Sequence, residues 1–350
     1  MIEAPLSLPT ATGLREAQRL PRVLSQYRDP NAAWSLVEIV VTLGPFTMLW
    51  AAMWGLMHFS YGLSLALALP AAGFLVRLFM IQHDCGHGSF FRDRAVNDWV
   101  GRAFGVFTLT PYDYWKRTHA AHHASAGNLE RRGQGDIATL TVDEYLALSW
   151  HGRLGYRLYR HPVVMFGIGP LYLFLVQHRA PVGLMRGAGW KPWISVMSTN
   201  LGIAIVAALL MWLVGPGPFL MIHGPILLLA ATIGVWLFYV QHQFEGVHWA
   251  HERDWRFPDA ALYGSSHYDL PLVLRWFSAN IGVHHVHHLA SRIPFYRLPE
   301  VLRDFPELAK VGRVTLLGSL GCVRYALWDE NAQRMISFRA LRDRALPSPT

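Results

Sequence analysis

Three short histidine clusters are the part of the sequence best suited to chemistry. They read HDCGH at 83–87, HAAHH at 119–123 and HHVHH at 284–288. Histidines three or four residues apart share one face of a helix, so each cluster predicts one edge of a metal site. One more histidine, His242, directly follows the long apolar segment 219–241. The first cluster directly follows another such segment, 62–82, in the same way. The predicted metal ligands are therefore His83, His87, His119, His122, His123, His242, His284, His287 and His288.

The number and type of these ligands restrict the metal. Neutral imidazole suits Fe, Cu, Zn and Ni, whereas Mg and Ca prefer oxygen ligands. A structural zinc ion takes four protein ligands and a catalytic one takes three with water, so this count predicts two metal ions with open positions. Groups that hydrogen-bond to metal-binding rings orient them. Candidates for that supporting role are Asp84, Asp113, Asp136, Glu245, Asp269 and His285.

The chain has 18 histidines, and most of the others are expected to be interfacial or structural side chains. For two of them, His248 and His267, the sequence leaves both interpretations open. The expected bystanders are His58, His151, His161, His178, His223 and His251.

Long apolar segments must position the clusters. Of the 350 residues 52% are hydrophobic and 15% charged, against roughly 25% charged in a soluble domain, which argues against a soluble enzyme. Two predicted hairpins of transmembrane helices comprise 37–59 with 62–82 and 194–214 with 219–241. A fifth run at 163–177 is short and contains Gly and Pro, which favours an interfacial or re-entrant helix. The expected fold is an all-α multi-pass membrane protein forming a single domain over 1–350.

Basic residues predict the orientation of the spans. Thirteen Lys and Arg fall in 83–193 and thirteen in 242–350, and neither hairpin turn contains any. By the positive-inside rule both of these segments, which would form a helical cap, and the N-terminal segment 1–33 are cytoplasmic. The net charge of +8 then reflects orientation and is no sign of nucleic-acid binding. The expected location is the bacterial inner membrane, with the metal site on the cytoplasmic side.

The three clusters, their spacing and the paired spans resemble the histidine boxes of the integral-membrane fatty acid desaturase family. The resemblance covers about residues 30–300, and the segments HDCGHGSFF, FYVQHQFEG and HHVHHLASRIP are similar to bacterial acyl-lipid desaturases. It implies a di-iron centre of two Fe ions, bound by the box histidines other than His285 and by His242. With O2 and two electrons, such a centre converts a C–C single bond of an acyl chain to a cis double bond. Overall resemblance favours position delta-12 (omega-6), with delta-5 and delta-9 as alternatives.

The resemblance also bears on the electron donor. Some members of the family carry a fused cytochrome b5 domain with a His-Pro-Gly-Gly motif, and this sequence contains no such string. We therefore expect a separate donor, such as ferredoxin or flavodoxin, and membrane lipid acyl chains as substrate. A basic cytoplasmic surface could bind the donor, although positive-inside bias alone explains the same charges.

Two alternatives to desaturation remain at this point. The same metal site could hydroxylate an acyl or sphingolipid chain, or hydroxylate or ketolate a carotenoid; product mass separates these reactions from desaturation. A transporter or sensor for Zn or Ni belongs to another class and would be expected to place ionisable residues inside its spans. The second predicted hairpin contains no Asp, Glu, Lys or Arg within its two spans, which disfavours that interpretation.

Overall fold

The computed structural model describes residues 19–133, 135–181 and 189–345. It is mostly helical, and four helices are long and apolar enough to cross a membrane, as the sequence predicts. Residues 1–18 of the expected N-terminal segment lie outside the described residues. The four candidate spans are α2 (Ala32–Met57), α3 with α4 (Tyr61–Ala66 and Ala68–His87), α10 (Lys191–Val214) and α11 (Pro216–His242).

Local sequence signals set the ends of these spans. Asn31 caps α2, since its side-chain oxygen accepts hydrogen bonds from the backbone N–H groups of Ala33 and Trp34. The first histidine cluster completes α4, which stops at Gly88 in a left-handed conformation (φ +64°). Between α10 and α11 the chain turns at Gly215 (φ +90°), and Pro216 begins the second helix.

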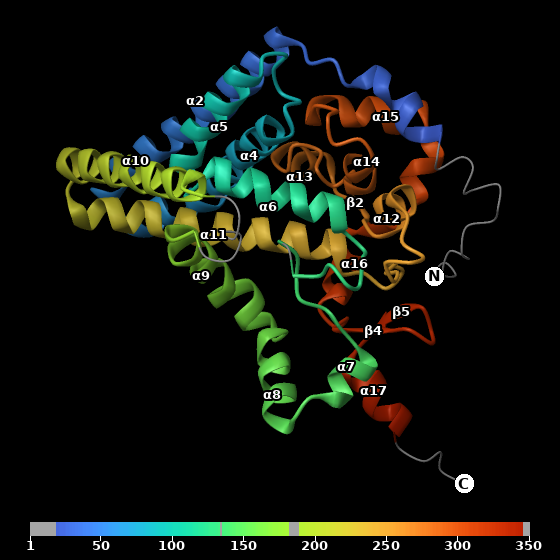
Figure 1. Ribbon diagram of the computed structural model, residues 1–350. Coiled ribbons are helices and arrows are strands. Elements are labelled where there is room, and N and C mark those ends of the chain that lie inside the picture. The colour runs from blue at the N-terminus through green and yellow to red at the C-terminus, as the bar shows by residue number, and fades with distance from the viewer. Residues whose placement is uncertain (1–18, 134, 182–188, 346–350) are drawn as a thin grey trace.

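Helices α4 and α11 form the centre of the bundle, with α2 and α5 (Arg94–Phe107) against α4. The small residues Ala68, Ala71 and Ala72 are fully buried along α4 and allow close approach of its neighbours. A charged pair lies inside this bundle: Arg77 of α4 is bonded to Glu38 of α2. Figure 1 shows α10 and α11 running side by side toward the end of the molecule farthest from the cap.

Short helices cover the other end of α4 and α11 and form the cap. All of them except the N-terminal η1 follow α6 (Tyr112–Ser125) in the chain, and α6 packs against α4 and α10. Two strands in the cap, β2 (His267–Asp269) and β3 (Arg313–Thr315), pair in parallel. The remaining helical elements of the cap are α12 (Phe257–Tyr263), α13 (Leu272–Phe277), α14 (His284–Leu289), η4 (Phe295–Arg297), α15 (Leu298–Asp304), η5 (Pro306–Lys310) and α16 (Leu316–Cys322), with η1 (Leu24–Tyr27) at the N-terminal side.

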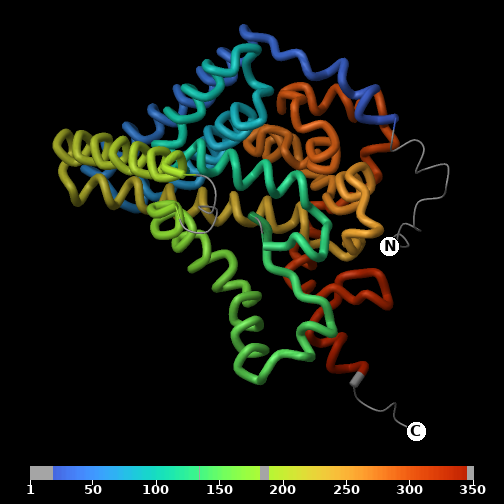
Figure 2. The backbone as a smooth tube through the Cα atoms, viewed as in Figure 1, coloured from blue at the N-terminus to red at the C-terminus, as the bar shows by residue number. Residues whose placement is uncertain are grey.

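A smaller unit, here called the side lobe, projects from the bundle (Figure 2). It contains three helices and a three-stranded sheet in the order β1-β4-β5, with its own small apolar core. These strands and the pair in the cap depart from the expected all-α fold, and each is two or three residues long. The pairs β1–β4 and β2–β3 join segments far apart in the sequence, whereas β4 and β5 pair as neighbours along the chain. The lobe comprises β1 (Leu140–Thr141), α7 (Val142–Ala147), α8 (Trp150–Tyr159), β4 (Leu327–Asp329), β5 (Arg334–Ile336) and α17 (Phe338–Ala345).

The fifth apolar run of the sequence connects the side lobe to the spans. It forms the π-helical turn η2 (Val164–Ile168), α9 (Gly169–Leu175) and η3 (Gln177–Arg179). The helix over Val164–Arg179 is bent by 56° from α8, so the two make a broken span or a re-entrant loop. Helix α9 packs against α11.

Candidate metal centre

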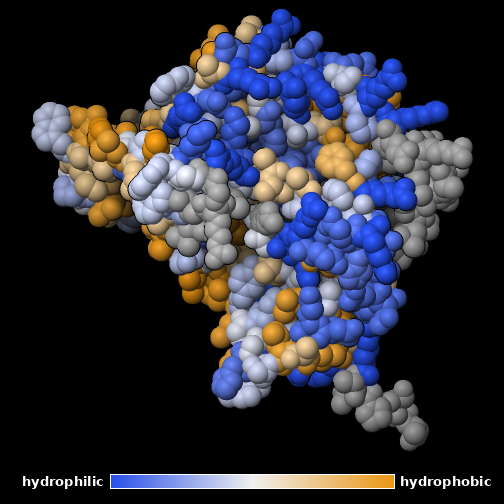
Figure 3. Space-filling model, in the orientation of Figure 1, coloured by the Kyte–Doolittle hydropathy of each residue, from blue (hydrophilic) through white to orange (hydrophobic). Residues whose placement is uncertain are grey.

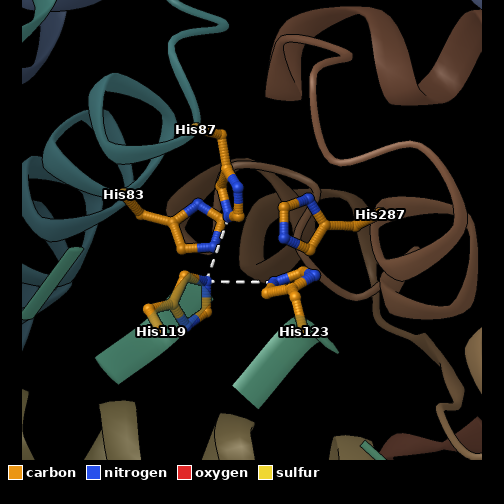
Figure 4. Close-up of side chains that lie close together, drawn as sticks. All are labelled: His83, His87, His119, His123 and His287. Atoms are coloured by element: carbon orange, nitrogen blue, oxygen red, sulfur yellow. Dashed lines mark hydrogen bonds between the residues drawn. The ribbon is translucent and has the colours of Figure 1, made fainter. Parts of the chain in front are cut away.

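Five histidines from three helices converge at the end of α4. His83 and His87 lie one turn apart on α4, His119 and His123 one turn apart on α6, and His287 lies on α14. One ring nitrogen of each lies within 4.8 Å of those of all the others. Figure 4 shows the rings pointing toward one another from the three helices. We call this set the five-histidine cluster.

A second group, the four-histidine cluster, comprises His122, His242, His284 and His288. The Nε2 atom of His242 is central, 3.1 Å from Nε2 of His122 and 3.0 Å from Nε2 of His284. The Nε2 atoms of His284 and His288 are 3.1 Å apart. All nine histidines predicted as ligands are thus brought into one of two groups.

The two clusters adjoin because α6 and α14 each contribute to both. On α6, His122 turns toward His242 while the neighbouring His123 turns toward the five-histidine cluster. The rings of His123 and His288 stack between the groups, with centroids 4.0 Å apart and planes 13° apart. The two groups of histidines are therefore adjacent and built on shared helices, and each could hold a metal ion; the number of ions stays a prediction.

Burial keeps these rings neutral. Desolvation holds the pKa of His119, His122, His123 and His287 well below the ordinary histidine value, and neighbouring histidines lower it further. The same holds for the pKa of His284 and His288. Neutral imidazole is the form that binds metals, because it carries a free lone pair.

The spacing of the nitrogens fits a bound cation better than hydrogen bonding among the rings. Nε2 of His119 lies 3.0 Å from Nε2 of His87 and 3.1 Å from Nε2 of His123. A ring nitrogen carries either one proton or one lone pair, so this atom cannot bond well to both neighbours. Two nitrogens at right angles on one ion, each about 2.1 Å from it, would be about 3.0 Å apart. Nε2 of His287 is buried without a hydrogen-bond partner among the described residues, as expected of an atom reserved for a metal.

Two contacts turn the correct nitrogen toward the clusters. Nδ1 of His83 lies 3.1 Å from one carboxylate oxygen of Asp84, and the other oxygen accepts the backbone N–H of Phe295 at 2.7 Å. Nδ1 of His242 lies 3.2 Å from the carbonyl oxygen of Gly264. With Nδ1 donating to these acceptors, Nε2 of each ring is left with its lone pair facing the cluster.

The structure gives the other five supporting candidates different partners. Asp113 pairs with Arg102, and Asp136 accepts the backbone N–H of Gly133. Glu245 accepts the hydroxyl of Tyr325, Asp269 pairs with Arg275 and Arg313, and Nε2 of His285 lies 2.9 Å from the Leu308 carbonyl. Among the six candidates, Asp84 is therefore the residue with a contact that orients a clustered ring.

The remaining histidines lie outside both groups in the part of the chain that the structure describes. His251 joins Glu130 and Glu330 at the surface, and His267 packs against His285 and lies 2.6 Å from the Ala309 carbonyl. His58, His151 and His161 are exposed, and His178 is buried elsewhere. His223 and His248 are half-buried.

Aromatic residues that sequence reasoning did not single out complete the walls of the site. The Trp115 ring stacks on His119, with centroids 4.6 Å apart and planes 15° apart. Phe238 contacts the rings of both His122 and His242. Each lies four residues before a clustered histidine, on the same helix face, and this spacing is the signal that could have identified them.

The sequence pattern of the fatty acid desaturase family matches residues 60–316, which include all three histidine clusters and His242. The chain belongs to the fatty acid desaturase family. It is similar to a fatty acid desaturase of Bacillus subtilis, with 42% identity over 93% of this chain and 92% of that protein.

More distant desaturases come from Synechocystis. One is an sn-1 acyl-lipid omega-3 desaturase (ferredoxin), 28% identical over 63% of this chain and 61% of its own length. Another is an sn-1 oleoyl-lipid 12-desaturase, 27% identical over 64% of this chain and 63% of its own length. Membership makes this desaturase an oxidoreductase, and its two histidine clusters can hold metal.

Proposed function

We propose that this desaturase is an O2-dependent acyl-lipid desaturase with a di-iron centre, which introduces a cis double bond into a membrane fatty acyl chain. The observation that carries the proposal is the pair of adjoining, buried clusters of neutral imidazoles at the ends of α4 and α11. The expected position is delta-12, as the name of the oleoyl-lipid relative also suggests; delta-5 and delta-9 are the alternatives to be tested.

The nine clustered histidines would hold the iron. Bound iron would supply the oxidising power toward an unactivated methylene that amino-acid side chains lack, using O2 and two electrons. Overall, the acyl chain loses two hydrogens, and with two further protons and two electrons O2 is reduced to two water molecules. Asp84 and Gly264 would hold ring orientation during turnover through their contacts with His83 and His242.

Apolar residues around the two histidine clusters would also contribute to the reaction. Trp115 and Phe238 pack on the clustered rings and would limit the access of bulk water. Because α4 and α11 each end in the clusters, an acyl chain lying between apolar helices could approach from the bilayer. In a bacterial inner membrane, the cytoplasmic side would then contain both termini and the segments 83–193 and 242–350. A ferredoxin or flavodoxin could deliver electrons there, and the name of one relative includes ferredoxin.

Fatty acid methyl ester analysis tests the proposal directly. Cells expressing the wild type should contain a new monounsaturated or further unsaturated species, two hydrogens lighter, whose double-bond position is fixed by derivatisation and mass spectrometry. The His287→Ala variant should lack this product and bind less iron, whereas the exposed His151→Ala variant should behave as wild type. A product heavier by one oxygen would identify a hydroxylase. Full activity of His287→Ala would overturn the ligand assignment.

A further inference from the structure

Helix α8 of the side lobe carries a largely exposed apolar stripe. Trp150, Leu154 and Leu158 follow one another at four-residue spacing and are 68%, 48% and 55% exposed. This spacing places them on one face of the helix. Exposed apolar stripes of this kind mark contacts with a membrane or with another protein.

Contacts on the opposite face of α8, and at the residue that follows the helix, fix it to the rest of the side lobe and to the end of α11. The buried hydroxyl of Tyr156 donates to the Ala326 carbonyl at 2.6 Å. Arg160, also buried, donates to the Gln243 side chain at 2.8 Å and to the Tyr239 hydroxyl at 3.2 Å, at the end of α11. Helix α8 is therefore held in one orientation relative to α11.

The stripe continues into apolar surface that belongs to the spans. Beyond the bend, Ile168, Tyr172 and Leu175 are exposed along η2 and α9, and α9 packs on α11. Figure 3 shows hydrophobic colour continuing from the spans along the edge of the molecule toward the side lobe. If the spans lie in a bilayer, this continuity favours lipid as the partner of the stripe.

A groove of about 470 Å³ lies beside the stripe, between α7, α8 and α17. Trp150 and Leu154 line it together with Phe338, so its floor is apolar. Arg157 and Arg342 also line it. The Nε–H group of Arg157 donates a hydrogen bond to the Tyr145 hydroxyl. Arg342 forms a long ion pair, in which its Nε lies 3.7 Å from a carboxylate oxygen of Asp343.

An apolar floor with guanidinium groups beside it is suited to an anionic amphiphile. We propose that α8 lies along the membrane surface and that the groove between α8 and α17 binds an anionic phospholipid through its phosphate and upper acyl chains. The proposal rests on the membrane placement of the spans given under the proposed function, and its tests do not depend on desaturation.

Lipid binding to the purified full-length chain tests the groove. Native mass spectrometry would compare phosphatidylglycerol with phosphatidylcholine of the same acyl chains. One arginine near a lipid phosphate corresponds to about a fivefold change in affinity, so Arg342→Gln should weaken phosphatidylglycerol binding by about that factor and leave phosphatidylcholine binding unchanged. The control is Arg339→Gln on the same helix, which removes the same charge outside the groove. Equal binding of both lipids, or equal loss in both variants, would overturn the proposal.

A spin label tests the orientation of α8 independently. The two native cysteines are buried, so Leu154→Cys can be labelled in the full chain and reconstituted in phosphatidylglycerol–phosphatidylcholine nanodiscs. The label should be more accessible to O2 than to a water-soluble nickel complex, and a label on Arg253→Cys, an exposed position of the cap, should show the reverse. Water accessibility at residue 154 would instead indicate a surface for an acidic protein partner and would contradict the proposal. Iron content and product analysis report the proposed function separately.

Discussion

Replacing Asp84 by asparagine separates a residue that orients a metal ligand from residues that are merely near the histidines in sequence. One oxygen of Asp84 faces Nδ1 of His83 at 3.1 Å, and the other accepts the Phe295 backbone N–H at 2.7 Å. Asparagine keeps one of these two acceptors and turns an NH2 group toward the other donor. One of the two hydrogen bonds is therefore lost, and a buried donor remains unpaired.

The expected size of the effect follows from that loss. Removing a contact that orients a metal ligand typically lowers metal affinity about 10- to 100-fold, which corresponds to about 1.4 to 2.7 kcal/mol. The assay is the iron content of the purified chain after equilibration with graded concentrations of chelator. Asp84→Asn should shift half-loss of iron to a chelator concentration lower by this factor, with turnover falling in parallel.

Asp113→Asn is the matched control, because sequence reasoning proposes Asp113 for the same role. Its carboxylate pairs with Arg102 in a half-exposed position, where an ion pair contributes little. Iron affinity should therefore remain within about twofold of wild type. Unchanged iron affinity in Asp84→Asn, or an equal loss in Asp113→Asn, would refute the reasoning from ring orientation.

Three further perturbations address the packing and charges around the site. In Gly86→Ala the new Cβ would lie 2.8 Å from the Trp115 ring, so overpacking should cost about 1 to 3 kcal/mol and reduce iron retention on chelator titration. Glu38→Gln should leave Arg77 buried without a counter-charge and destabilise the bundle by about 3 to 5 kcal/mol, measured by the loss of folded protein on detergent or thermal challenge. Hydrogen bonds to two glutamates raise the pKa of His251. The stabilisation that protonated His251 contributes is therefore fully present below pH 6.5 and is lost as the pH rises through the raised pKa. The thermal stability of His251→Gln should accordingly approach that of wild type at high pH.

Matched controls accompany these three changes. Gly44→Ala adds the same methyl group where no atom lies within 4 Å, and it should be neutral. Glu300→Gln breaks a surface ion pair and should cost far less than the change inside the bundle. His161→Gln alters an exposed histidine outside the His251 ion pairs and should not change the pH dependence. A control that behaves like its partner variant would contradict the corresponding argument.

The sequence predicted those parts of the structure that depend on local periodicity. Apolar run length was enough to locate all four candidate spans, and three- and four-residue spacing was enough to place His119 and His123 together. The strand pairing of 267–269 with 313–315 was not foreseen, because such short strands have no periodic signal and depend on contacts across the cap.

The sequence also could not predict which of the candidate carboxylates contacts a clustered histidine ring. Asp84 and Asp113 both lie close to a histidine cluster in sequence, yet Asp84 faces a clustered ring and Asp113 faces Arg102. That difference depends on where the Phe295 backbone and Arg102 lie in the folded cap. Sequence distance fixes neither position.

Sharing of α6 and α14 between the two clusters constrains the order of events during biosynthesis. The five-histidine cluster needs α4, α6 and α14, and the four-histidine cluster needs α6, α11 and α14. Neither is complete until α14 has left the ribosome, after both hairpins have been made. Metal binding would then be a late step in folding that links the cap to both hairpins. An ion that binds only the folded state stabilises that state relative to unfolded ones.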